Sequence, residues 1–207
     1  MSADATVFVV DDDASVRRSL ERLLRAAGLA VRTFASAEQF LATAPVDAPS
    51  CLVLDLRMSG IDGLDLQQQL QAAGRDQAIV FISGHGSVPA SVRAMRAGAV
   101  DFIEKPFDDE ELLGAVHRAL ARDASERAAR GAREEVQACF EWLTPREREV
   151  LALVVTGLPN KLVADRLGTT EKTVKVHRGR VMTKMRAQSL AHLVRLAQKI
   201  GIDGETR

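Results

Sequence analysis

Short apolar runs alternate along the first half of the chain with longer stretches in which apolar residues recur every three or four positions. The stretches have the period of amphipathic helices. The runs have the length and composition of buried parallel strands, and they cover residues 7–10, 30–34, 52–54, 79–82 and 100–103. This alternation predicts an α/β fold over residues 1–120, with a doubly wound sheet of (βα)5 order.

The second half of the chain shows only the helical period. Residues 121–140 are rich in Ala, Arg and Glu, which predicts a helical or partly flexible linker. Thr144 then has the position of a helix N-cap, with Pro145 in the first turn and Glu147 at the capping-box position. We therefore expect a small all-α domain over residues 141–207.

The formal net charge of +0 hides a difference between the two halves. Residues 1–120 hold 11 Lys and Arg against 17 Asp and Glu, whereas residues 140–207 hold 13 against 7. An acidic half followed by a basic half predicts two domains with different partners. The partner of the second, basic domain is expected to be a polyanion. Because no apolar stretch has membrane-spanning length and the amino terminus does not resemble a secretory signal, we expect a cytoplasmic protein that has no membrane partner.

A polar residue of a different chemical kind follows each of four predicted strands. Asp11 and Asp12 follow the first strand, and later strands are followed by Asp55, Ser83 and Lys105. Ligands of open α/β sheets collect beyond the carboxyl ends of the strands, so these side chains are expected at one spot. Carboxylates suit Mg²⁺, while a hydroxyl and an ammonium suit phosphate oxygens. Taken singly, each residue is typical of a turn or a helix cap, but together they indicate a phosphate and metal site.

The segments that carry these residues resemble the receiver domain of two-component response regulators. They read VVDDD at 9–13, VLDLRM at 53–58, FISGHG at 81–86 and AGAVDFIEKPF at 97–107. The resemblance implies a flavodoxin-like fold, Mg²⁺ (or Mn²⁺) as cofactor, a sensor histidine kinase as phosphoryl donor and a cis peptide bond before Pro106. It also implies the site residues: Asp55 as phosphoacceptor; Asp11, Asp12, Asp55 and Arg57 around the metal; and Ser83 and Lys105 on the phosphate.

Phe102 and Ser59 add detail to this resemblance. Phe102 corresponds to the family's switch aromatic, which turns inward when the phosphoryl group draws Ser83 toward it; an ordinary core position is the alternative. The neighbouring face, built from residues 89–97 and 100–103, commonly dimerises in this family. Ser59 stands where the family usually has Pro, so we expect a change in loop rigidity that affects the lifetime of the phosphoryl group.

Residues 160–167, the turn 168–170 and residues 171–185 have the spacing of a DNA-binding helix-turn-helix. Residues 171–186 carry six basic residues against one acid; a solvated basic face is the alternative interpretation. At about 100° per residue, one face of this helix gathers Val174, Val181 and Met185. The opposite face presents Lys172, Lys175, Val176, Gly179 and Thr183, so one face can pack while the other enters a major groove.

Three segments of this half resemble the LuxR-type DNA-binding domain: LTPREREVL at 143–151, GLPNK at 157–161 and TVKVH at 173–177. Together with the receiver, they make the chain similar to the FixJ/NarL class of transcription regulators. The resemblance implies double-stranded DNA as a partner. The DNA-binding residues that it implies are Lys161, Lys172, Thr173, Lys175, Val176, His177 and Lys184. For His177, on the flank of the helix, a structural role beneath the recognition helix is the alternative.

These features predict a transcriptional regulator of a two-component system, gated by phosphorylation, rather than an enzyme. Phosphoryl transfer to Asp55 is expected to promote a homodimer whose two basic domains bind one promoter site. One alternative is an orphan regulator that binds DNA without phosphorylation, and the complete set of site residues argues against it. Another is a small α/β phosphatase with Asp55 as nucleophile, but that chemistry usually needs a second aspartate where this chain has Arg57.

Overall fold

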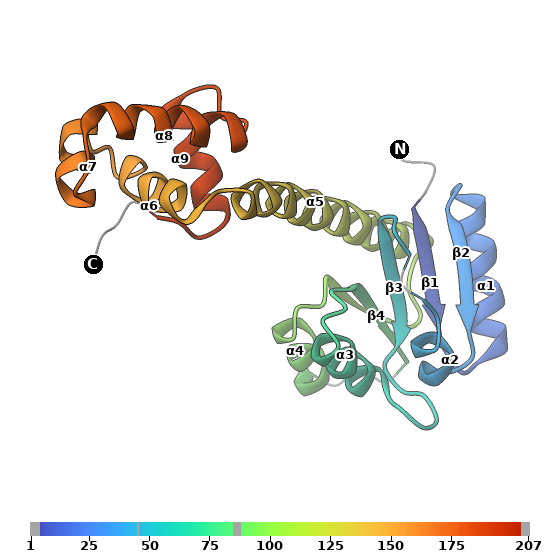
Figure 1. Cartoon of the computed structure of the whole chain (residues 1–207). Helices are drawn as coiled ribbons and strands as arrows, with labels where there is room; N and C mark the ends of the chain where they lie inside the picture. Colours follow the sequence, from blue (N-terminus) through green and yellow to red (C-terminus); the bar gives the residue numbers. More distant parts are fainter. Residues whose placement is uncertain (1–4, 45, 85–87, 204–207) are drawn as a thin grey trace. The chain divides into compact units, whose positions relative to one another are not determined.

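The computed structural model describes residues 5–44, 46–84 and 88–203. Positions 85–86 of the FISGHG segment lie outside these described residues. The chain divides into two compact units, Met1–Arg127 and Ala128–Arg207, of which the first contains the sheet and the second is helical (Figure 1). None of the helices in the described ranges has the length and apolar character of a membrane span.

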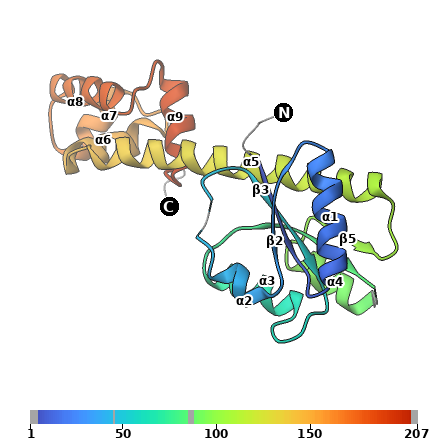
Figure 2. The ribbon, with the colours of Figure 1, turned by 90° about the vertical axis from the view of Figure 1, so that its right-hand side faces the viewer.

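A five-stranded parallel sheet forms the centre of the first unit. Its strands are β1 (Thr6–Val10), β2 (Ala30–Phe34), β3 (Ser50–Asp55), β4 (Ala78–Ser83) and β5 (Asp101–Glu104). Their order across the sheet is β2-β1-β3-β4-β5, and every pairing is parallel; Figure 1 labels the first four of these strands and Figure 2 also labels β5. The predicted α/β doubly wound fold is confirmed, with each expected strand present within two residues of its predicted bounds.

Helices cover both faces of this sheet (Figures 1 and 2). One face carries α1 (Ala14–Ala26) and the amino-terminal part of α5 (Asp109–Glu141), and the other carries α2 (Ala37–Leu41), α3 (Gly63–Ala72) and α4 (Val88–Arg96). Buried side chains such as Leu24 and Leu112 on the first face, and Phe40 and Leu66 on the second, fill the space against the strands. Each contributes roughly 1.5–3 kcal/mol by its removal from water.

The central strands explain why the sequence shows continuous apolar runs rather than alternating ones. All six residues of β3 and all six of β4 are buried. Because helices cover both faces, side chains that point either way must be apolar. The polar exceptions stand at strand ends: Ser50 begins β3, and Asp55 and Ser83 are the last residues of the two strands, at the carboxyl edge of the sheet.

The segment 121–140, expected as a linker, is helical because α5 continues through it without a break. Its first part is attached to the sheet through Asp123, whose buried carboxylate accepts hydrogen bonds from Ser50 N–H at 2.8 Å and from Arg127 Nε at 2.7 Å. Arg127 also donates to the carbonyl oxygen of Val46 at 3.1 Å. These bonds extend the first unit several residues into the expected linker.

The second unit is all-helical, as predicted. It contains α6 (Pro145–Val154), α7 (Asn160–Leu167), α8 (Glu171–Lys184) and α9 (Leu190–Lys199), packed with the carboxyl-terminal part of α5 around a core that includes Leu151, Val163, Val174 and Leu193. The capping box predicted for α6 is confirmed: Thr144 Oγ1 accepts from Glu147 N–H at 3.3 Å, and Thr144 N–H donates to Glu147 Oε2 at 2.9 Å.

The turn between α7 and α8 depends on Gly168. This residue has φ 59°, in the left-handed region that favours glycine, and it ends α7. Two residues later, Thr170 caps α8 by accepting the N–H of Thr173 at 3.2 Å. The helix, tight turn and second helix expected from the sequence spacing are therefore confirmed.

Candidate functional site

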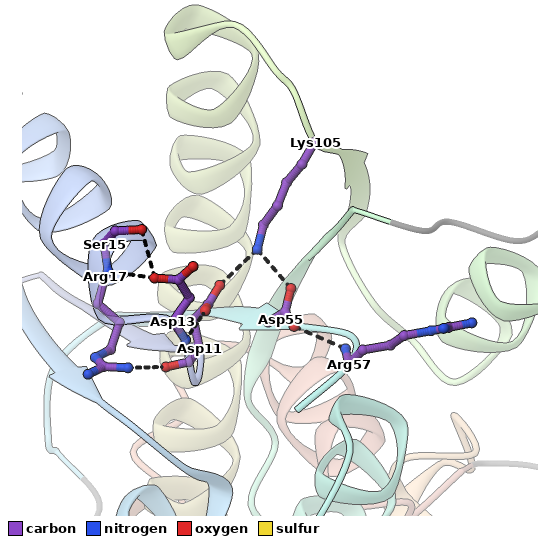
Figure 3. A network of polar contacts seen from close by, with 7 residues as sticks. All are labelled: Asp11, Asp13, Ser15, Arg17, Asp55, Arg57 and Lys105. Atoms are coloured by element: carbon purple, nitrogen blue, oxygen red, sulfur yellow. Dashed lines mark hydrogen bonds and ion pairs between the residues drawn. The ribbon is translucent and has the colours of Figure 1, made fainter. Parts of the chain in front are cut away.

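Three side chains meet at the carboxyl edge of the sheet, beyond β1, β3 and β5. The ammonium group of Lys105 donates to Asp11 Oδ2 at 2.8 Å and to Asp55 Oδ1 at 2.9 Å. Figure 3 shows the lysine side chain reaching between the two carboxylates. Asp11 is 1% exposed and Asp55 is 6% exposed, so water screens their charges poorly. The two carboxylates therefore depend on this cation, the only lysine in residues 1–120.

Strand register explains how these positions come together. The residues directly before Asp11 and Asp55 are partners across β1 and β3. On the other side of the site, Lys105 N–H donates to the carbonyl oxygen of Ser83 at 2.8 Å, which holds Lys105 over the end of β4. The peptide bond between Lys105 and Pro106 is cis, as the resemblance implied. The Ser83 side chain is buried at the same edge.

The acidic run after β1 divides its carboxylates between the site and the start of α1. Asp13 is the N-cap of α1, and its carboxylate accepts the N–H of Ser15 at 2.7 Å. Asp11 Oδ1 accepts the N–H of Asp13 at 2.8 Å, and Arg17 Nη1 donates to the carbonyl oxygen of Asp11 at 2.6 Å (Figure 3). The helix-cap interpretation thus applies to Asp13, whereas Asp11 faces Asp55.

Burial and charge act in opposite directions on the pKa values at this site. Burial raises the pKa of Asp55, and the hydrogen bond and charge of Lys105 offset only part of that rise. Burial also acts to lower the pKa of Lys105, but its hydrogen bonds and ion pairs with Asp11 and Asp55 outweigh burial, so the pKa is raised overall. The charged form is thus favoured for Lys105, which pairs with two carboxylates, and disfavoured for Asp55, chiefly because of its burial.

The other residues expected around a metal lie on the adjoining loops. Asp12 is exposed, and its Oδ2 accepts from Ser59 N–H at 2.9 Å and from Ser59 Oγ at 3.1 Å. Arg57 N–H donates to Asp55 Oδ2 at 3.1 Å, while its guanidinium extends away from the site (Figure 3). Within the described residues, no three acidic, His or Cys side chains gather closely enough to hold a metal ion.

The donor set nevertheless fits Mg²⁺ in chemical kind. Asp11 and Asp55 offer hard oxygen donors that already share one cation, and Asp12 lies at the start of the adjoining loop. Mg²⁺ commonly takes one or two carboxylates and completes its octahedron with waters and phosphate oxygens. The carboxylate of Asp12 contacts Ser59 and is not gathered with the other two.

Phe102, on β5, stands between the core and the surface. Its ring is half-buried and stacks on Phe81 with centroids 6.2 Å apart and an interplanar angle of 29°. The neighbouring α4 exposes three apolar side chains, Val88, Val92 and Met95, at 77%, 42% and 45%. At spacings of four and three residues, these side chains lie along one side of α4.

In the second unit, α8 presents an exposed basic face. The residues predicted to face outward are all exposed: Lys172, Lys175, Val176, Gly179 and Thr183. The apolar residues of the opposite face are buried in the core: Val174, Val181 and Met185. A groove of about 410 Å³ runs along the exposed face, lined by Lys175, Val176, Gly179, Arg180, Thr183 and Lys184. Lys161, near the start of α7, is also exposed.

Three of the predicted DNA-binding residues, Thr173, His177 and Lys184, are held inside the second unit. The hydroxyl of Thr173 lies 2.8 Å from that of Thr170. Lys184 Nζ donates to the buried Glu147 Oε2 at 2.6 Å and to the carbonyl oxygen of Trp142 at 3.1 Å. Burial acts to raise the pKa of Glu147, but hydrogen bonds from Lys184 and Thr144 outweigh it and lower the pKa. His177 is half-buried, which agrees with the structural alternative for this residue. The structural role of Lys184 had no signal in the sequence.

Comparison with known proteins gives a consistent result over the whole chain. The model of the response regulator receiver domain matches residues 7–117, and that of bacterial regulatory proteins of the luxR family matches residues 141–197. The chain is 51% identical to Nodulation protein W of Bradyrhizobium diazoefficiens, over 97% of this chain and 88% of the relative. It is 47% identical to the transcriptional regulatory protein FixJ of Azorhizobium caulinodans, over 98% of this chain and 96% of the relative.

Solved structures extend this similarity to the fold. The response regulator StyR has a TM-score of 0.84 at 48% sequence identity, covering 94% of this chain and 98% of its own. Full-length FixJ from B. japonicum has a TM-score of 0.59 at 39% identity, covering 97% of this chain and 99% of its own. Both similarities extend over the receiver and the helical domain.

We predict that Lys105→Met lowers the free energy of unfolding of the first unit by about 1–3 kcal/mol at neutral pH, because it leaves two buried carboxylates without a cation. The raised pKa of Lys105 keeps its stabilising contribution complete below the usual lysine value of 10.5. Below that pH, the loss of stability caused by Lys105→Met should shrink only in acid, where the carboxylates take up protons. Urea denaturation at neutral and acidic pH measures both effects.

Arg25→Met is the matched control, because it removes a cation from an exposed ion pair with Glu21. It should change stability by less than about 0.5 kcal/mol at either pH. Equal losses for Lys105→Met and Arg25→Met, or a loss for Lys105→Met that is the same in acid, would contradict the shared-cation interpretation.

Proposed function

We propose that this chain, which belongs to the FixJ/NarL class of two-component response regulators, receives its signal as a phosphoryl group on Asp55. The family regulates transcription in a phosphorylation-dependent manner, through a receiver domain and a LuxR-type DNA-binding domain. The observation that carries the proposal is the ammonium of Lys105 held between Asp11 and Asp55 at the carboxyl edge of the sheet. In our proposal, residues 1–120 receive the signal, residues 121–140 transmit it and residues 141–207 bind DNA.

The proposed transfer is a displacement at phosphorus. A carboxylate oxygen of Asp55 forms the new P–O bond, and the P–N bond of a phosphohistidine donor on a sensor kinase breaks, returning the electron pair to the imidazole. The three carboxylates of Asp11, Asp12 and Asp55, with the carbonyl of Arg57, would hold Mg²⁺ (or Mn²⁺). The metal ion supplies charge neutralisation that lets an anionic nucleophile approach an anionic phosphoryl group.

Lys105 and Ser83 are the proposed contacts of the phosphoryl group. Lys105 already donates to Asp55 Oδ1, so its ammonium lies where a phosphoryl oxygen on Asp55 would need a cation. Ser83 ends β4 at the same edge, and its hydroxyl is the proposed donor to a second phosphoryl oxygen. Since Lys105 N–H is bonded to the carbonyl of Ser83, a movement of one is passed to the other.

Phe102 is the proposed link from this site to the molecular surface. Its half-buried ring, stacked on Phe81, would turn inward when Ser83 moves toward the phosphoryl group. That rotation would change the surface beside the exposed apolar side chains of α4, where we place the contact between two receivers. In a dimer, two DNA-binding domains act on one site with a raised effective concentration, without any new contact in either domain.

The proposed DNA contacts follow from exposure on the second unit. Lys175 and Val176 line the groove of α8 and would reach base edges, whereas Lys161, Lys172 and Thr173 would contact phosphates. His177 and Lys184 would support the helix from within the unit, Lys184 through Glu147. The chain has no proposed activity on a separate substrate, because position 57 offers Arg rather than the general acid that a phosphatase of this chemistry needs.

The proposal predicts that incubation with acetyl phosphate and Mg²⁺ adds one phosphoryl group to the wild-type chain, and none to Asp55→Asn. The physical reason is that an amide cannot form the acyl phosphate. Intact-protein mass spectrometry measures the product. Asp47→Asn, at an exposed carboxylate before the start of β3 and thus beyond the end of that strand opposite to Asp55, is the control and should be labelled like the wild type. Labelling of Asp55→Asn to the wild-type extent would contradict the assignment.

A second prediction concerns Lys175. Lys175→Ala should weaken binding to a duplex selected by the wild-type chain from a random pool by about tenfold or more, and should weaken nonspecific binding much less, because a base contact carries sequence information. Fluorescence anisotropy at one fixed salt concentration gives both affinities. Lys199→Ala, at an exposed position on α9, is the control and should change neither. Equal losses on both duplexes would show that Lys175 touches only phosphate.

A further inference from the structure

Ser59 contacts the acidic site through two donors at once. Its backbone N–H lies 2.9 Å from Asp12 Oδ2, and its hydroxyl lies 3.1 Å from the same oxygen. These two residues are 47 positions apart in the chain, so the contact joins the loop after β3 to the loop after β1. The loop that follows Asp55 is thus hydrogen-bonded to the carboxylate of Asp12, one of the residues of the expected metal site.

A proline at this position could make neither bond, because proline has no N–H and no hydroxyl. The chain thus departs from the pattern of its family at the one loop position whose side chain and backbone both bind Asp12. Ser59 in place of proline therefore does more than remove the conformational restriction of a proline ring, because it adds a contact with Asp12.

The two bonds compete with a metal ion for Oδ2 of Asp12. A carboxylate oxygen has two lone-pair sites, so two donors on Oδ2 occupy both of them and leave only Oδ1 for another partner. In the described part of the chain, Asp12 does not gather with Asp11 and Asp55 into a metal-binding group. Bringing its carboxylate to the other two requires the contact with Ser59 to loosen.

We propose that Ser59 is a positioning residue that holds Asp12 away from the metal site and so weakens metal binding by the receiver. The inference rests on the proposed function, since it takes Asp12 as a metal residue. Ser59 acts through Asp12 and not on the metal itself. Its effect is a lower occupancy of the site at a given Mg²⁺ concentration, which makes phosphorylation of this chain more dependent on Mg²⁺.

Metal affinity of the full chain, measured without any phosphoryl donor, tests the proposal. Mn²⁺ is titrated into the protein, and the free ion is followed by electron paramagnetic resonance. Ser59→Ala, which loses the hydroxyl, should bind Mn²⁺ about threefold more tightly, and Ser59→Pro, which loses both donors, should bind more tightly still. Ser59→Thr keeps both donors and should match the wild type. Ser91→Ala, which removes a hydroxyl on α4 that contacts its own helix, is the control.

The outcomes separate this inference from the proposed function. Unchanged or weaker binding by Ser59→Ala would overturn the role of Ser59, because weaker binding would mean that Ser59 prepares Asp12 for the metal. Asp12→Asn distinguishes the two claims: if it abolishes Mn²⁺ binding while Ser59→Ala changes nothing, only the inference fails. If Asp12→Asn binds Mn²⁺ like the wild type, both the inference about Ser59 and the assignment of Asp12 as a metal residue fail.

Discussion

One ammonium shared by two buried carboxylates is the constraint on which the receiver depends. Asp11 and Asp55 end neighbouring buried strands, where the parallel register places them at one level. Without Lys105 their charges would be close and poorly screened, and burial would push one of them toward its neutral form. The same arrangement that stabilises the fold also prepares the chemistry, because a cation already lies beside the carboxylate proposed to accept the phosphoryl group.

This constraint also explains how a small chemical change is passed on. In the proposed function, a phosphoryl group on Asp55 would bring additional negative charge to a site where one cation already serves two anions, and Lys105 and Ser83 would rearrange around it. Their backbones are joined by a hydrogen bond, and Phe102 lies on the strand that leads to Lys105. The proposed route from Asp55 to the surface is therefore short, because Phe102 stands only three positions before Lys105.

Elements with a period along the sequence were predictable, and the topology of a parallel sheet also predicted that Asp11, Asp55 and Lys105 meet at its carboxyl edge. Other contacts between distant side chains were not predictable. The apolar runs identified the central strands because two covered faces leave few polar positions inside them, and the spacing around Gly168 identified the helix-turn-helix. Three other contacts had no such signal in the sequence. They are the hydrogen bonds of Asp123 with the sheet, of Ser59 with Asp12 and of Lys184 with its buried glutamate. Each joins residues whose proximity arises only after the chain has folded.

The central claim is that the state of Asp55 controls DNA binding by the other unit. The most direct test is the affinity of the full chain for a duplex that it selects from a random pool, measured by fluorescence anisotropy with Mg²⁺, with and without beryllofluoride as a mimic of the phosphoryl group. We predict tighter binding with beryllofluoride for the wild type and no change for Asp55→Ala. Equal affinity of the wild type in both conditions, or the same gain in Asp55→Ala, would contradict the account.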